Sequence, residues 1–315
     1  MQDMKARYFY HSFARRSPAD ENGYGKELQI LQSMLDVGLL LTPERIEFKE
    51  RLRDGSYSEP ATIFQKRICF TELSEEELPA HCTNFGEFSI EWDQEILRKL
   101  GAIPVFYVPL KGELGSAETA AASILARLGD IQSVLERLAY IQEVSRDDVA
   151  ARPIEVFNSV TGEVEKLFDK IDGQNLVAYL EKDVQPIQEL LNSLRATFGY
   201  FYPTENLEYG DLLSYYRQRE WRIVGSMVLD GVELTADLDH AETVAVSKID
   251  TQFFDRELDY PTGKKRIAEQ ILKYPSFGGR HILETCRRII VPASVQEQVR
   301  EILRGGKIQV KVDTL

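Results

Sequence analysis

Short strand-like segments lie at both ends of the chain with a helix-like stretch between them, and this arrangement most constrains the fold. Strand-like alternation or short apolar runs occur over 6–13, 67–73, 87–92, 103–110, 220–238, 241–249, 286–292 and 307–313. We expect the Asp-Gly pair at 230–231 to join two strands. Short alternating strands suit a split or highly curved, mostly antiparallel sheet. Without regular strand–helix–strand winding, the pattern predicts an α+β fold.

Helical periodicity places a helix directly after the first strand. Leu28, Leu31, Met34 and Leu35 fall on one helix face, and Gly38 can end the helix. Further helices are predicted over 93–101, 263–275 and 294–304. Segment 75–86 begins as a short helix, and Pro79 marks either a break near its end or a fresh start. The glycine-rich segment 275–281 lacks the strand and helix that flank a dinucleotide-binding turn, which favours a flexible loop.

The composition changes after Gly112, and residues 114–198 look almost entirely helical. Helices are predicted over 160–171 and 174–196. An apolar seam at helical spacing comprises Ile124, Leu128, Ile131, Leu135 and Leu138. This seam is either core packing or the contact surface of a homo-oligomer. We therefore divide the chain into 1–113 and 199–315, two halves of a mixed α+β core, and a helical insertion over 114–198. This block is either an inserted helical subdomain or a helical cap over the mixed sheet.

The charge balance limits the kinds of partner. The formal net charge is −13 and the pI is ≈ 5.0. Phosphate binding needs a basic face, so the charge argues against a protein that generally coats nucleic acid, although it does not exclude a local basic groove. The pair Arg287–Arg288 is interpreted as a solvated surface pair. An acidic surface suits a protein partner that carries a basic one.

The three cysteines, Cys69, Cys82 and Cys286, are odd in number and lack CxxC spacing. A disulfide framework and a cysteine zinc site are therefore not expected. The start of the chain has no apolar leader, and no later run approaches the roughly 18 apolar residues that span a bilayer. These features predict a cytoplasmic protein without a membrane anchor.

The familiar short catalytic and nucleotide-binding motifs are absent. The sequence contains no GxxxxGK[ST] phosphate loop, no GxGxxG after a strand, no HExxH and no GxSxG. The four histidines are far apart along the chain, so no metal site is predicted.

Polar residues stand at strand positions where a plain core would be apolar: His11, Thr71 with Glu72, and Gln218 with Glu220. Residues i and i+2 of a strand share a face, so Gln218 and Glu220 would lie side by side. A carboxylate beside an amide can bind a ribose hydroxyl or stabilise an oxocarbenium-like transition state. The simpler interpretation pairs Glu220 with Arg222 or with a cross-strand lysine on an amphipathic strand.

The opening segments 8–13 and 31–40 resemble those of DarT-like ADP-ribosyltransferases. Segments 68–73 and 81–108, followed by 219–224 and 287–292, resemble the AbiGi-type abortive phage-resistance family. The similarity covers the first block and the two C-terminal blocks, and it leaves 114–198 uncovered. The resemblance to ADP-ribosyltransferases implies a split sheet of that type.

The resemblance to ADP-ribosyltransferases also implies site roles and a substrate. Glu220 would be the catalytic carboxylate, Gln218 its target-orienting partner, and His11 the first residue of the triad. NAD would be the substrate and no metal would be needed. The residues implied to bind NAD are His11, Tyr10, Thr71 and Tyr216.

Two classes of function follow. The first is an enzyme of phage defence or of a toxin–antitoxin pair. It would transfer ADP-ribose from NAD to a macromolecule, with nucleic acid as one conceivable target, or hydrolyse NAD. The second is a non-catalytic antitoxin, sensor or assembly subunit. It would bind a defence-system component or a phage protein through its helical and acidic surface.

Overall fold

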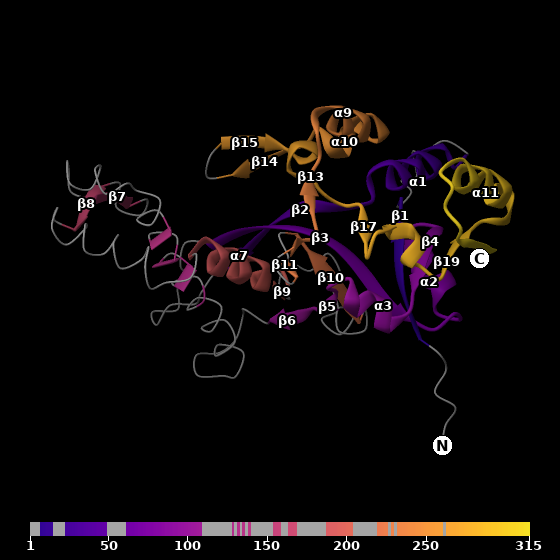
Figure 1. Ribbon diagram of the computed structural model, residues 1–315, viewed down its shortest axis with the longest axis horizontal. Helices are drawn as coiled ribbons and strands as arrows, with labels where there is room; N and C mark the ends of the chain where they lie inside the picture. The colour runs from indigo at the N-terminus through magenta and orange to yellow at the C-terminus, as the bar shows by residue number, and fades with distance from the viewer. Residues whose placement is uncertain are drawn as a thin grey trace, which may run out of the picture.

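The fold is given by a computed structural model (Figure 1). The structure describes residues 7–14, 23–48, 61–108, 154–158, 163–168, 187–203, 219–225, 228–229, 232–260 and 263–315, with scattered helical positions between 128 and 139. Gln218, Tyr216 and most of the block 114–198 lie outside the described residues.

One large sheet forms the centre of the described part of the chain, with ten strands. Its main path runs β13-β16-β2-β3-β1-β4-β19-β20, and β10 joins β3 and β5 beside that path. All neighbours are antiparallel except β19 and β20, which are parallel. The strands are β1 (Tyr8–Phe13), β2 (Leu39–Phe48), β3 (Ala61–Leu73), β4 (Phe88–Trp92), β5 (Ile103–Pro104), β10 (Glu220–Val224), β13 (Ala236–Asp237), β16 (Leu272–Tyr274), β19 (Arg288–Val291) and β20 (Lys311–Thr314).

The long strand β3 is where the sheet divides. Thr71 pairs with Tyr10 of β1 and also with Glu220 of β10, so these two strands flank β3 on opposite edges. Arg67 pairs with β2 on one side and with β10 on the other. Strands β1 and β2 therefore share one edge of β3, each along a different part of its length. The mostly antiparallel sheet expected from the sequence is confirmed.

Five two-stranded ribbons accompany the sheet in the described ranges. They are β6 (Phe106–Val108) with β9 (Phe201–Pro203), which are parallel, and four antiparallel pairs: β7 (Ile154–Asn158) with β8 (Glu163–Phe168), β11 (Val228–Leu229) with β12 (Val232–Glu233), β14 (Glu257–Tyr260) with β15 (Gly263–Arg266), and β17 (Ser276–Phe277) with β18 (Arg280–His281). The β11–β12 pairing confirms the strands predicted around 230–231.

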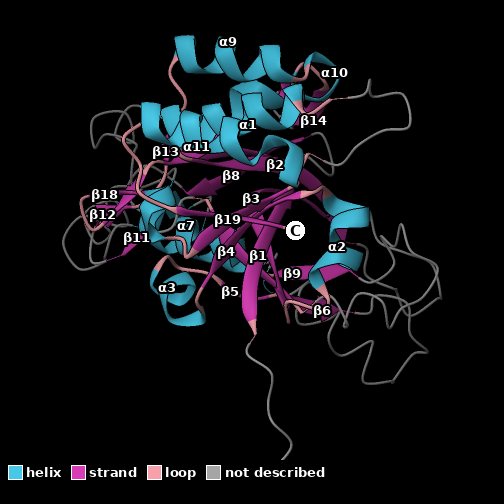
Figure 2. Ribbon diagram, turned by 90° about the vertical axis from the view of Figure 1, so that its right-hand side faces the viewer, coloured by secondary structure: helices cyan, strands magenta, loops and turns pink. Residues whose placement is uncertain are grey.

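Several helices lie against the sheet, and Figure 2 shows α1, α9 and α11 stacked above it. The α-helices are α1 (Gly25–Val37), α2 (Leu78–Phe85), α3 (Gln94–Lys99), α7 (Ile187–Phe198), α9 (His240–Ile249), α10 (Thr251–Phe254) and α11 (Gln296–Gly305). The 3-10 helices are η1 (Ile267–Gln270), η2 (Ile282–Thr285) and η3 (Ala293–Val295). None of the helices within the described ranges is long and apolar enough to cross a bilayer.

The main hydrophobic core lies between the sheet and helices α1 and α11. It joins side chains from both ends of the chain, including Leu31, Met34, Phe70, Phe88, Ile90, Trp92, Val299 and Leu303. A second cluster forms where α2 covers Tyr10 of β1 and Ile290 of β19. Because these residues alternate with core residues along their strands, the second cluster lies on the other face of the sheet.

Helix α1 ends at the glycine that the sequence indicated. Gly38 has a φ of 97°, and a Cβ at this position would lie 2.3 Å from the carbonyl oxygen of Tyr274. Only glycine combines this left-handed backbone with so close an approach to β16. The helix therefore stops where the chain must turn tightly into β2.

Two predictions at the C-terminal end are wrong. Segment 241–249 was expected to be a strand but forms most of α9, because Asp239 and Glu242 make a capping box. The Asp239 side chain accepts from the Glu242 backbone at 2.9 Å, and the Glu242 side chain accepts in return at 2.8 Å. Segment 263–275 was expected to be a helix but forms β15, η1 and β16. Pairing of β16 with β2 overrides its helical periodicity.

The predicted helix over 160–171 is also wrong where the structure describes it. Residues 163–168 form β8, whose backbone pairs antiparallel with β7. The pairing is local, because β7 directly precedes β8 in the chain, and it outweighs the helical periodicity. Helix α7 confirms the end of the helix predicted over 174–196, and the segment 275–281, expected to be a flexible loop, contains the ribbon β17–β18.

Candidate functional site

Glu220 and Arg222 form an ion pair on the face of β10. The Arg222 Nε donates to Glu220 Oε1 at 2.7 Å, and Nη2 donates to Oε2 at 3.2 Å. The hydroxyl of Tyr107 on β6 donates to the same Oε2 at 2.8 Å. The side chains of Arg222 and Glu220 are only 1% and 10% exposed. This is a two-point, charge-assisted contact that is almost removed from water.

A second arginine and an amide extend this contact into a network. Arg67 donates to Gln65 Oε1 at 3.0 Å, and Arg222 approaches the same oxygen at 3.4 Å. Both guanidinium groups lie over the ring of Tyr202 on β9, at 5.3 and 4.9 Å from its centroid. We call the set the Arg222 network, and its members are Gln65, Arg67, Cys69, Tyr107, Tyr202, Glu220 and Arg222.

The network also fixes the end of α7. Gln65 Nε2 donates to the carbonyl of Phe198 at 2.7 Å, and Arg222 Nη1 donates to the carbonyl of Gly199 at 3.3 Å. Carbonyl groups at the end of a helix need such donors because no helical partner remains. The side chains of β3 and β10 therefore hold the α7–β9 connection to the sheet.

Strand alternation explains why these side chains meet. Residues at every second position of β3 share a face, which gives Gln65, Arg67, Cys69 and Thr71. Antiparallel pairing sets Glu220 opposite Thr71 and Arg222 opposite Cys69. These residues therefore form one polar face that extends across the neighbouring strands β3 and β10.

The charges in the network hold Glu220 ionised. Burial alone would raise the pKa of Glu220, but the positive charges of Arg222 and Arg67 outweigh it and hold this pKa below its ordinary value. Burial, followed by the nearby charge of Glu220, raises the pKa of the Cys69 thiol to about 11. The same two causes raise the pKa of Tyr107. The thiol therefore stays protonated at neutral pH and is not an activated nucleophile.

The structure places the residues singled out from the sequence in two groups. Tyr10, Thr71 and Glu220 form one row across β1, β3 and β10. His11 follows Tyr10 and so belongs to the alternate set, and its ring lies 5.9 Å from that of Phe70. Gln218 and Tyr216, like Tyr215, lie outside the described residues. The pairing of Glu220 with Arg222 matches the simpler of the two interpretations that the sequence left open.

His11 sits beside the division of the sheet. Its Nδ1 lies 2.9 Å from the carbonyl oxygen of Cys69, at the point where β1 has parted from β3. Burial lowers the pKa of His11, although this hydrogen bond opposes the shift. Burial, and to a smaller extent the charge of His11, lowers the pKa of His81 to about 4. Both imidazoles are therefore neutral at pH 7.

Replacing His81 by glutamine should flatten the dependence of stability on pH. The pKa of His81 lies at about 4 in the folded chain and ordinarily at 6.5. Between these values the unfolded chain binds more protons, so the free energy of unfolding falls as pH falls from 6.5 towards 4. Urea unfolding at several pH values should show that the variant loses about 1–2 kcal/mol less than the wild type over this range. An unchanged slope would contradict this assignment.

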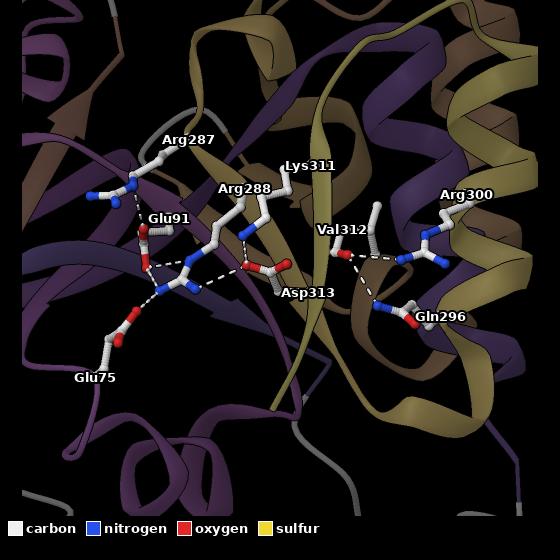
Figure 3. A network of polar contacts seen from close by, with 9 residues as sticks. All are labelled: Glu75, Glu91, Arg287, Arg288, Gln296, Arg300, Lys311, Val312 and Asp313. Carbon is white, nitrogen blue, oxygen red and sulfur yellow. Dashed lines mark hydrogen bonds and ion pairs between the residues drawn. The ribbon is translucent and has the colours of Figure 1, made fainter.

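A second polar cluster, unnoticed in the sequence, surrounds Glu91 of β4 (Figure 3). Its side chain is fully buried, and Oε2 accepts from Arg288 Nη2 at 2.7 Å and from Nε at 3.0 Å. Arg287 lies 3.3 Å from Oε1. Arg288 also donates to Asp313 of β20 at 3.0 Å and contacts Glu75. Figure 3 shows the Arg288 guanidinium between these three carboxylates.

This cluster corrects the interpretation of Arg287–Arg288 as a solvated surface pair. The Arg288 side chain is 16% exposed and makes three ion pairs, whereas Arg287 is 42% exposed. The pairing of Glu91 with Arg288 across β4 and β19 causes the difference. Alternation along β4 places Glu91 on the face opposite Phe88, Ile90 and Trp92, so the strand pattern gives no sign that this carboxylate is buried.

The parts of the chain that the structure describes contain no group of three metal-ligating side chains placed to hold an ion. In both clusters a buried carboxylate is paired with an arginine, Glu220 with Arg222 and Glu91 with Arg288. Such sites hold strands in register and orient charge, and their carboxylates are already occupied by cations.

Comparison with known proteins gives one match. A family model described as "Putative abortive phage resistance protein AbiGi, antitoxin" matches residues 62–252. The matched range runs from β3 to α10 and contains the whole Arg222 network. No curated protein and no solved structure matches the chain.

Proposed function

Since the chain belongs to the AbiGi family of abortive phage-resistance proteins, we propose that it is the antitoxin of a defence pair and neutralises a toxic protein by binding it. The observation that carries this proposal is the family match over residues 62–252, which covers more than half of the chain. This function corresponds to the non-catalytic alternative drawn from the sequence.

The state of Glu220 supports a binding role. Its carboxylate already accepts from Arg222 and Tyr107, and it is only 10% exposed. A carboxylate that stabilises a transition state must present a free oxygen to the substrate. In this arrangement Glu220 instead ties β10 to β6 through the hydroxyl of Tyr107.

The charge of the chain also supports a protein partner. A net charge of −13 attracts a basic surface and speeds its association. The acidic surface and the block 114–198 remain the proposed contact regions, and most of that block lies outside the described residues.

Co-expression with the gene of a candidate toxin should test the proposed function. Induction of that gene alone should arrest bacterial growth, and co-expression of this chain should restore it. The two purified products should then elute together in size-exclusion chromatography. Growth arrest caused by this chain alone, or unrelieved arrest despite soluble expression, would refute the antitoxin role.

The finer assignments from the sequence stay predictions. They are the ADP-ribosyltransferase-like sheet, the helical insertion at 114–198, and NAD as a substrate of Glu220 and His11. The shared edge of β3 supports the split-sheet assignment. NAD use needs its own measurement, which is the consumption of NAD by the purified protein.

A further inference from the structure

A pocket with a volume of about 620 Å³ opens between α11, the 307–310 connection and β20. It lies at the end of the large sheet, because β20 is the last strand of the main path. Its apolar lining includes Leu303, Ile308 and Val310. Its size falls within the range of about 300–1,000 Å³ that is typical of ligand pockets.

Four cationic side chains line this pocket, namely Arg300, Arg304, Lys307 and Lys311. One carboxylate, Asp313, also lines it, and that group is held by Lys311 at 2.7 Å and by Arg288 at 3.0 Å. The pocket is therefore positive on a chain whose net charge is −13. A negatively charged ligand would be attracted to this pocket and repelled by most of the remaining surface.

Two of the cationic side chains make only long ion pairs with an exposed carboxylate, and a third makes none within the part of the chain that the structure describes. Arg300 and Arg304 lie 3.4 and 3.6 Å from the exposed carboxylate of Glu297. Within the described residues Lys307 makes no ion pair, and its side chain is exposed. Its ammonium group is thus available to a ligand at the rim of the pocket.

The backbone of Lys307 is the unusual feature of this site. Its φ is 58°, in the left-handed region. The Lys307 amide donates to the carbonyl of Arg304 at 3.1 Å, and the Ile308 amide donates to that of Leu303 at 2.9 Å. These bonds form the Schellman ending of α11, in which the left-handed position is usually glycine. Glycines occupy 305 and 306 instead, and the strained position carries a lysine at the pocket rim.

We propose that this pocket binds an acidic segment of the toxic partner, with carboxylates at the basic rim and apolar side chains on its floor. The assignment rests on the proposed function, because it names the chemistry of one segment of that partner, which is distinct from the basic surface that the acidic remainder of the chain attracts. A nucleic acid fits less well, since none of the lining residues is aromatic and single strands bind largely by base stacking. A long nucleic acid would also be repelled by the negative charge of the rest of the chain.

The main variant is Lys307→Gly, which separates binding from folding. Glycine takes the left-handed conformation without strain, so the variant should unfold at the same temperature as the wild type or higher. The probe is a fluorescein-labelled decapeptide of alternating Glu and Leu, read by fluorescence anisotropy. We expect its affinity for Lys307→Gly to be about tenfold weaker than for the wild type. The matched control is Lys264→Gln, which removes an exposed charge outside the pocket and should bind as the wild type does.

The remaining measurements separate the outcomes. Binding should weaken with added salt, because the rim charges are exposed. Equal affinity of Lys307→Gly and wild type would overturn the proposal. So would tighter binding of a ten-nucleotide oligothymidylate or of inorganic phosphate than of the peptide. If the wild type dimerises and Lys307→Gly does not, a second copy of the chain occupies the pocket. This result would also overturn the proposal.

Retention of the toxin distinguishes this proposal from the proposed function. Capture of the toxin by the wild type but not by Lys307→Gly supports both. Equal capture by the two proteins leaves the antitoxin role intact and overturns the assignment of the pocket. Failure of the wild type to bind the toxin refutes the antitoxin role, while the peptide measurement still decides what the pocket binds.

Discussion

Replacing Arg222 by methionine should lower the free energy of unfolding by about 3–5 kcal/mol. The change removes the cation but leaves the Glu220 carboxylate in a site where it is 10% exposed. It also removes the donor to the Gly199 carbonyl at the end of α7. A buried charge without its partner is among the most costly defects in a folded chain. Urea unfolding followed by circular dichroism measures the loss.

The double variant Arg222→Met with Glu220→Gln is the control for this result. The amide carries no charge, so the double variant should recover part of the lost stability even though it lacks both charged groups. A loss below about 1 kcal/mol would contradict this expectation, because only exposed ion pairs are that weak.

Replacing Arg288 by methionine should cost about 3 kcal/mol. Arg288 makes the closest contacts to the fully buried Glu91 and also reaches Asp313 of β20. Removing it should both destabilise β4 and loosen the terminal strand. We therefore expect faster hydrogen exchange at the amides of β20 than in the wild type, together with the lower free energy of unfolding.

The neighbouring arginine provides the matched control. Arg287 contacts the same carboxylate at 3.3 Å, but its side chain is 42% exposed. Exposed ion pairs contribute at most about 1 kcal/mol, so Arg287→Met should cost about 1 kcal/mol or less. Equal losses for the two variants would show that the buried position of Arg288 does not matter.

Local signals in the sequence were sufficient for many elements. The spacing of Leu31 and Met34 and the position of Gly38 predicted α1 and its end. Alternation predicted β4 and β10. For 241–249, an alternation of valines masked the capping residues Asp239 and Glu242, whose identity and spacing could have indicated the helix.

The candidate site could be predicted only along single strands. The pairing of Glu220 with Arg222 follows from two positions on one strand, and the sequence offered it as an interpretation. Glu91 and Arg288 are 197 residues apart, and their contact depends on the register between β4 and β19. No local pattern encodes that register, because it is set by packing of the whole sheet.

The covering of β20 has a consequence for assembly. Gln296 donates to the carbonyl of Val312 at 3.0 Å, and Arg300 approaches it at 3.4 Å (Figure 3). Side chains of α11 thereby occupy a group that an added strand would need. A second chain could extend the sheet at β20 only after displacing them. Growth of fibres by strand addition is therefore disfavoured at this edge, and contacts between molecules here have to be made by side chains.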